Sequence, residues 1–120
     1  MTSLKTNNNA TPGVSNSTTG TTTDAYVAAL TLVCLGYSQK TIIIANTDTA
    51  NSLTFKADGY ANRDSTISYP ILAATILAHG DSYKLDITNP YDQIILSVVS
   101  TAAPGSPATY QIDHVLQRSA

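Results

Sequence analysis

The stretch LAHGDSYKLDITNPYDQIILSVVS, residues 77–100, decides the fold because it holds two strand patterns separated by a corner. Apolar and polar side chains alternate over residues 82–88 and again over residues 92–100. This period of two is that of a strand with one buried face. The apolar residues expected to form one wall of a core are Tyr83, Leu85, Ile87, Ile94, Leu96 and Val98.

Turn residues bracket the first of these two strands. Gly80 tolerates the positive φ of a tight turn, and Asp81 directly after it favours the same role. Asn89 and Pro90 close the strand, because Pro has no N–H to donate to a sheet. Two strands with alternating polarity, joined by a connection that contains turn residues, predict consecutive strands of an antiparallel β-sandwich.

The rest of the chain shows the same kind of pattern on both sides of this stretch. Further short strands are expected over residues 26–35, 40–46, 53–57, 66–77 and 108–117. Asp58-Gly59 is expected to end the third of them with a turn or bulge. Pro70 is expected to separate two short strands or to mark a sheet edge, and a short helix over residues 71–77 is the alternative there. Seven or eight short strands predict an all-β fold, an antiparallel β-sandwich of immunoglobulin-like or jelly-roll-like form.

Residues 1–24 have a different composition, dominated by Thr, Asn, Ser and Gly with few apolar side chains. Such a segment buries too little surface to offset the entropy of ordering it. We therefore expect a low-complexity, flexible N-terminal arm over residues 1–24 and a β-sandwich domain over residues 25–120. The arm is either a spacer or a segment that orders against a neighbouring subunit.

The chain carries too little positive charge to bind nucleic acid or an anionic membrane electrostatically. The formal net charge is −2, and charged residues make up 12% of the chain with no basic run. No segment approaches the roughly 18 consecutive apolar residues of a membrane-spanning helix. No secretory signal is visible at the N-terminus, so synthesis in a cytoplasm is expected.

Residues capable of chemistry are few and scattered. Cys34 stands alone between Val33 and Leu35 and is expected to be a buried small hydrophobe. His79 falls in a predicted turn, and His114 falls on the apolar side of the last strand. No nucleophile elbow, phosphate-binding loop or calcium-binding loop is present. The sequence therefore predicts no catalytic residues, no metal and no cofactor, and the protein is not expected to be an enzyme.

The isoleucine run Ile42, Ile43 and Ile44 is the strongest candidate for an assembly interface. A strand with three consecutive isoleucines is either buried on both faces or meets another subunit with its second face. Tyr91, directly after Asn89 and Pro90, is expected to pack across the corner and is the fourth candidate interface residue.

Three segments combine strand patterns with turn signals: KTIIIANTDTANSLTFKADGYAN (residues 40–62), residues 77–100, and ATYQIDHVLQR (residues 108–118). Together they resemble the small β-sandwich accessory proteins of tailed bacteriophage virions. The resemblance implies a structural protein of the virion, either a capsid decoration or cement protein or a neck or tail component. It implies other virion proteins as partners (major capsid, neck or tail subunits) and a homo-oligomer, located in the virion. It carries over no site residues.

A carbohydrate-binding or host-adhesion module is the alternative function. Seven tyrosines together with Asn and Asp supply groups that bind sugars, but Trp is absent. Tyr69, Tyr83 and Tyr110 fall on the apolar sides of their strands, which favours packing in a core or an interface.

Overall fold

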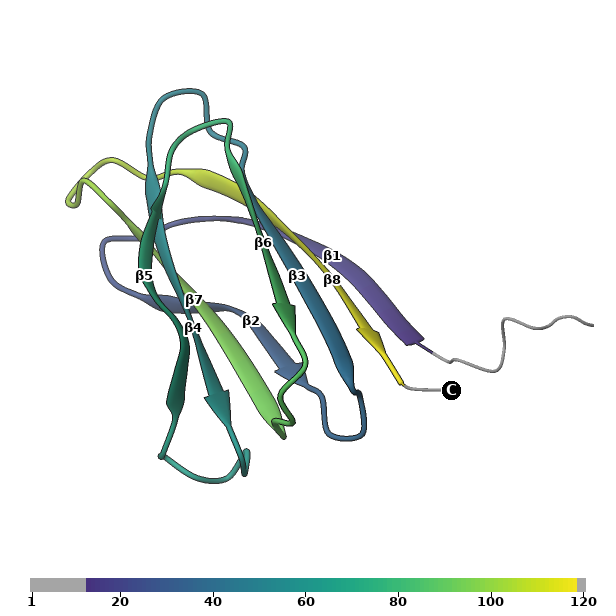
Figure 1. Ribbon diagram of the computed structural model, residues 1–120. Helices are drawn as coiled ribbons and strands as arrows, with labels where there is room; N and C mark the ends of the chain where they lie inside the picture. Colours follow the sequence, from purple (N-terminus) through teal and green to yellow (C-terminus); the bar gives the residue numbers. More distant parts are fainter. Residues whose placement is uncertain (1–12, 119–120) are drawn as a thin grey trace, which may run out of the picture.

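The structure is a computed structural model that describes residues 13–118, and every regular element in this range is a β-strand (Figure 1). The strands are β1 (Gly13–Thr21), β2 (Val27–Val33), β3 (Gln39–Asn46), β4 (Leu53–Tyr60), β5 (Tyr69–Leu77), β6 (Ser82–Ile87), β7 (Gln93–Ser100) and β8 (Thr109–Gln117). The predicted all-β antiparallel sandwich is confirmed. No helix among the described residues is long and apolar enough to span a membrane.

The strands form two four-stranded sheets, and all neighbouring strands are antiparallel. The first sheet has the order β1-β8-β3-β6, and the second sheet has the order β2-β7-β4-β5. The chain crosses between the sheets at every connection except that from β4 to β5. This strand order is that of an eight-stranded jelly roll, so the jelly-roll alternative is the correct one of the two sandwich forms expected.

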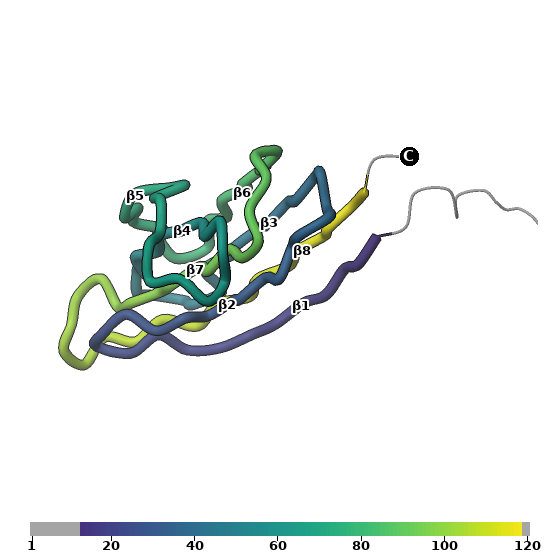
Figure 2. Tube along the Cα trace, turned by 90° about the horizontal axis from the view of Figure 1, so that it is seen from below, coloured from purple at the N-terminus to yellow at the C-terminus, as the bar shows by residue number. Residues whose placement is uncertain are grey.

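The two sheets lie face to face as layers, as the view from below shows (Figure 2). In this view β1, β3 and β8 run on together toward the side on which the described chain begins and ends. Gly13 at the start of β1 pairs with Gln117 at the end of β8. The strand order places β1 and β6 at the edges of the first sheet, and β2 and β5 at the edges of the second sheet.

The core lies between the sheets and follows the predicted alternation. In β4 and in β7 every second residue is buried. Phe55 is fully buried, and its ring meets that of Tyr83 edge to face with centroids 5.3 Å apart. Of the wall predicted from residues 77–100, Leu85, Ile87, Ile94, Leu96 and Val98 are buried, and Tyr83 is partly buried against them.

The N-terminal boundary of the sandwich differs from the one expected. Residues 13–21 were expected to belong to a flexible arm, but they form β1, which pairs with β8 over all nine of its residues. The strand is added through backbone hydrogen bonds, and most of its side chains stay exposed. Composition therefore gives no sign of it, because composition reports side-chain burial. The sandwich begins at Gly13, not at residue 25, and residues 1–12 lie outside the described residues.

The structure decides between the alternatives left open at Pro70 and corrects the prediction made at Asp58-Gly59. β5 continues through Pro70 as a single strand at a sheet edge, which agrees with the edge alternative and rules out the helix. β4 does not end at Asp58-Gly59 but runs on to Tyr60. Gly59 is needed inside the strand because the ring of Tyr91 occupies the space that a Cβ there would require. Gly80, by contrast, has a φ of 81° in the predicted turn.

Candidate assembly surfaces

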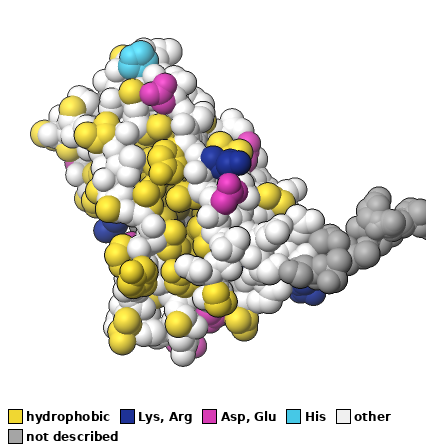
Figure 3. Space-filling view, viewed as in Figure 1, with side chains coloured by type: hydrophobic (Ala, Val, Ile, Leu, Met, Phe, Trp, Pro, Cys, Tyr) yellow, Lys and Arg dark blue, Asp and Glu magenta, His cyan; other side chains and the backbone are white. Residues whose placement is uncertain are grey.

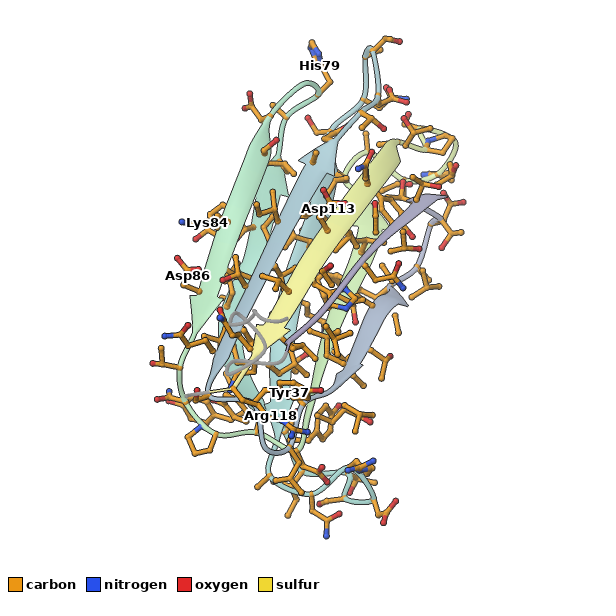
Figure 4. The ribbon with its side chains drawn as sticks, turned by 90° about the vertical axis from the view of Figure 1, so that its right-hand side faces the viewer. Tyr37, His79, Lys84, Asp86, Asp113 and Arg118 are labelled. Carbon is orange, nitrogen blue, oxygen red and sulfur yellow. The ribbon has the colours of Figure 1, made fainter. Side chains whose placement is uncertain are left out.

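The groups that could carry chemistry do not come together. His79 lies at the tip of the connection between β5 and β6, well away from Asp113 on β8 (Figure 4). Within residues 13–118 no three side chains of His, Cys, Asp or Glu are grouped as they would be to hold a metal ion. Asp48 serves the backbone of its turn: its Oδ2 accepts the N–H groups of Asn51 (2.8 Å) and Ala50 (3.1 Å). These bonds hold the pKa of Asp48 below its usual value.

His114 faces inward from β8, and Asp113 faces outward, as their sequence positions predict. The Nδ1 atom of His114 is buried and has no hydrogen-bond partner among the described residues. Burial lowers the pKa of His114, and the nearby Asp113 opposes this shift more weakly. Asp113 instead accepts a hydrogen bond from Gln111 Nε2 at 3.1 Å. The two neighbours therefore do not form a catalytic dyad.

A buried lysine that was not predicted from the sequence lies at one end of the sandwich. Lys40 is 1% exposed, and its Nζ donates to the carbonyl oxygens of Asn89 (2.7 Å) and Tyr37 (3.2 Å). Burial lowers the pKa of Lys40. Cys34 is buried nearby, as expected, and its Sγ donates to the Tyr91 carbonyl at 3.2 Å. Lys40 ties two chain connections together, which is a structural role.

The same end is held by an ion pair between two loops. Arg63 NH2 lies 2.7 Å from Asp92 Oδ1, and the Arg63 backbone N–H donates to Asp92 Oδ2 at 2.9 Å. The guanidinium keeps the pKa of Asp92 below its usual value. The connection between β4 and β5 is thereby fixed against the start of β7.

The four candidate interface residues are placed very differently. Ile42 and Ile44 are fully buried in the core, so they cannot contact another subunit. Tyr91 is partly buried and packs on Gly59. Ile43 projects from the outer face of the first sheet and is 41% exposed. It shares a shallow depression with Val115. The interface prediction therefore stays open for Ile43 and for the exposed part of Tyr91.

A larger apolar surface lies along β5 and the residues just before it, where the sequence pattern predicts only strand structure. Large side chains are exposed there: Ile67 is 79% exposed, Tyr69 68% and Ile76 65%. Figure 3 shows hydrophobic side chains gathered over β5 and in the space between β5 and β6. We call the exposed apolar residues Ile67, Tyr69, Pro70, Ala73, Ala74 and Ile76 the β5 strip.

The β5 strip is unusual for an edge strand because it contains no charged side chain. The sequence of β5, YPILAATIL, contains the relevant signal, because it places apolar residues on both faces of the strand. Edge strands that face water normally carry charges, because an apolar edge pairs with other chains. Large exposed apolar patches mark contact sites for other proteins. The sequence could not identify the strip, because it left open whether Pro70 marks a sheet edge or separates two short strands.

Comparisons with known proteins show the fold of this chain and not its family. No protein-family model matches the chain, and no curated protein matches it in sequence. Among solved structures it is similar to PirA, with a TM-score of 0.61, 15% identity, and coverage of 80% of this chain and 90% of PirA. It is also similar to the subunit of Bacillus endospore appendages, described as a family of disulfide-linked pili (TM-score 0.55, 11% identity, 91% and 89% coverage).

A third similar structure comes from the T13 viral particle of infectious bursal disease virus, abbreviated IBDV. The TM-score is 0.52 with 10% identity, and the match covers 90% of this chain but only 31% of the viral chain. Identities of 10–15% establish a shared fold, and a fold alone does not determine function.

Proposed function

We propose that this protein is a non-enzymatic structural subunit of a tailed-phage virion, acting as a capsid decoration or cement protein or as a neck or tail component. Its partners are other virion proteins, and its site of action is the assembled particle. The exposed β5 strip is the observation that carries this proposal, because it offers an apolar edge that another subunit would cover.

The proposed mechanism is burial of the β5 strip against a neighbouring subunit. Each Å² of apolar surface removed from water contributes about 25 cal/mol. The strip combines the exposed side chains of Tyr69 and Ile76 on β5 with that of Ile67 just before the strand. Pro70 cannot donate to a new ladder, and the pairing of β5 with β4 shifts register twice. Contact through side chains is therefore favoured over addition of a full strand at this edge.

The neighbours among solved structures are compatible with this role. A pilus subunit and a viral particle protein share the fold, so a sandwich of this shape serves in assemblies built from many copies. The resemblance of residues 40–62 and 77–100 to phage accessory proteins supports the choice of a virion among such assemblies.

The test compares binding to candidate particle proteins for two matched variants. Ile76→Asp places a charge in the β5 strip, and Val115→Asp places one on the outer face of the first sheet, where Val115 is 41% exposed. Both sites lie on strand surfaces, so both variants are expected to fold. Ile76→Asp should abolish binding to capsid, neck or tail subunits in size-exclusion chromatography with light scattering, and Val115→Asp should not.

Two results would count against the proposal. A wild-type protein that binds none of the capsid, neck and tail proteins would contradict the virion role. Loss of binding with Val115→Asp but not with Ile76→Asp would assign the contact to the surface around Ile43.

No observation on the described residues favours the sugar-binding alternative, because exposed Tyr26 and Tyr69 lie at opposite edges of the second sheet.

A further inference from the structure

The four edge strands of the sandwich are protected against pairing to very different degrees. β6 is short and carries Lys84 and Asp86, whose side chains lie 3.3 Å apart (Figure 4). β5 contains Pro70 and two shifts of register, and β2 has a shift of register between Ala28 and Leu30. Charges, Pro and bulges are the features that keep edge strands from pairing with other chains.

β1 has none of these protective features. Its sequence GVSNSTTGT contains no charge and no Pro, and its register with β8 is regular along its whole length. It is nine residues long, and most of it is exposed. Among the described residues no strand pairs with its other side. β1 is therefore a long edge with regular register and an open side.

The backbone groups that β1 presents at this edge can be identified from one hydrogen bond. The N–H of Thr22 donates to the carbonyl of Ala108 at 2.9 Å, which makes these opposed residues a hydrogen-bonded pair. Hydrogen-bonded and non-bonded pairs alternate along antiparallel strands. The even-numbered residues of β1 therefore bond to β8, and Ser15, Ser17 and Thr19 direct their N–H and C=O groups to the open edge.

The position of the Asn16 side chain agrees with this assignment. Its Oδ1 accepts the N–H of Ser17 at 2.8 Å. The amide of Asn16 thus covers one of the open-edge donors with a local bond. Such a bond is exchanged for a strand-to-strand bond when a second strand arrives.

We propose that β1 pairs antiparallel with β1 of a second copy of this chain, about a two-fold axis at Ser17. Ser17 then lies opposite Ser17 of the second copy, and Ser15 lies opposite Thr19. This register aligns the open-edge residues of both copies as hydrogen-bonded pairs. The two first sheets become one continuous sheet of eight strands, four from each copy.

A second copy fits this edge for reasons of charge and symmetry. β1 carries no charge, so two identical strands approach without repulsion. The register places Ser and Thr hydroxyls opposite each other, which is a favourable cross-strand pairing. A two-fold contact closes on itself and uses one β1 edge from each copy, so it yields a dimer.

This pairing deepens the proposed function, and it uses a separate surface. β1 is an edge of the first sheet, and the β5 strip is an edge of the second sheet. A dimer formed through β1 would leave both β5 strips available for other virion proteins. The two contacts can therefore fail independently in experiments.

Disulfide trapping tests the register directly. Opposed Cα atoms in a hydrogen-bonded antiparallel pair are about 5.5 Å apart, within the roughly 4.4–6.8 Å that a disulfide spans. Ser17→Cys should therefore give a disulfide-linked dimer on mild oxidation of the full chain. The Cys of Thr19→Cys would be offset from its mate by about 13 Å along the strand, so this matched variant should not cross-link. The native Cys34 is buried and does not compete.

A charge at the edge provides the second measurement. Ser17→Lys sets two like charges opposite each other and should eliminate the dimer mass in light scattering. Ser82→Lys is the matched control, because Ser82 is an exposed serine on the other edge strand of the same sheet. It should leave the dimer intact.

Three outcomes would overturn the inference. One is a folded Ser17→Cys protein that stays monomeric under oxidation, and another is equal cross-linking by Thr19→Cys. Cross-linking of Ser17→Cys that appears only after residues 1–12 are deleted would assign the edge to that segment instead of to β1 of a second copy. Cross-linking by Ser17→Cys together with no binding to virion proteins would support the β1 pairing and contradict the proposed function.

Discussion

At the scale of single residues, Lys40 shows how a charged side chain becomes part of a β-sandwich core. Its ammonium group replaces lost water with the carbonyl oxygens of Asn89 and Tyr37. These carbonyls belong to connections that are far apart in sequence. The bond pattern therefore holds two corners of the chain together at one end of the molecule.

Lys40→Ala should destabilise the protein by about 3 kcal/mol, because it leaves a cavity and removes both hydrogen bonds. Lys84→Ala is the matched control, since the Lys84 side chain is 61% exposed, and it should change stability by less than about 0.5 kcal/mol. Urea unfolding of both variants measures the difference. Equal stability of the two variants would show that Lys40 is not part of the core.

His114 gives the protein a predictable response to pH. Its pKa in the folded protein lies below the value of 6.5 expected when unfolded, because burial disfavours the imidazolium. Below pH 6.5 the unfolded chain therefore binds the proton more readily than the folded chain, and stability falls as the pH drops through this window. Above pH 6.5 the contribution is fully present.

Thermal unfolding measured from about pH 4.5 to about pH 8, which brackets the usual pKa values of histidine, detects this response. His114→Gln should flatten the loss of stability below pH 6.5. His79→Gln, at an exposed turn, should retain it. An unchanged slope in His114→Gln would show that another group is responsible.

At the scale of elements, β1 shows that a strand can join a sheet without contributing much to the core. Its backbone pairs with β8 along its full length while its side chains remain mostly exposed. The alternation of its hydrogen bonds then predicts which backbone N–H groups are internal. By this reasoning the N–H of Thr18 bonds to β8, and the N–H of Ser17 faces the open edge.

Proline substitution at these two neighbours should therefore give unequal results. Thr18→Pro removes a ladder hydrogen bond and should lower stability by at least about 1 kcal/mol relative to Ser17→Pro. Hydrogen exchange of the amides of β8 and thermal unfolding report the effect. The reverse order of stability would show that the hydrogen-bond alternation assigned to β1 is wrong.

At the scale of the whole molecule, the sandwich separates two kinds of contact surface. The β5 strip is apolar and irregular in register, which suits contact through side chains. The β1 edge is polar, uncharged and regular, which suits pairing through the backbone. The strands lie at edges of different sheets, so the two proposed contacts would not compete for the same surface.

Residues 77–100 show which features of the fold can be predicted from the sequence alone. Alternation in this stretch predicted β6 and β7 and their buried faces, because the period of two is a local property of a strand. Gly80 and Pro90 predicted the turns for equally local reasons. For the candidate interface, the isoleucine run identified an apolar strand, but only the structure separated exposed Ile43 from buried Ile42 and Ile44.

The sequence by itself determined the all-β class, most strand positions and the alternating core, since these depend on neighbours along the chain. Only the tertiary structure decided that β1 belongs to the sandwich and that β5 is an edge. It also decided that Lys40 is buried. Each of these depends on strand order, which is set by pairings between residues far apart in sequence. The exposed surfaces of a sandwich are consequences of that order, and therefore so are its candidate assembly contacts.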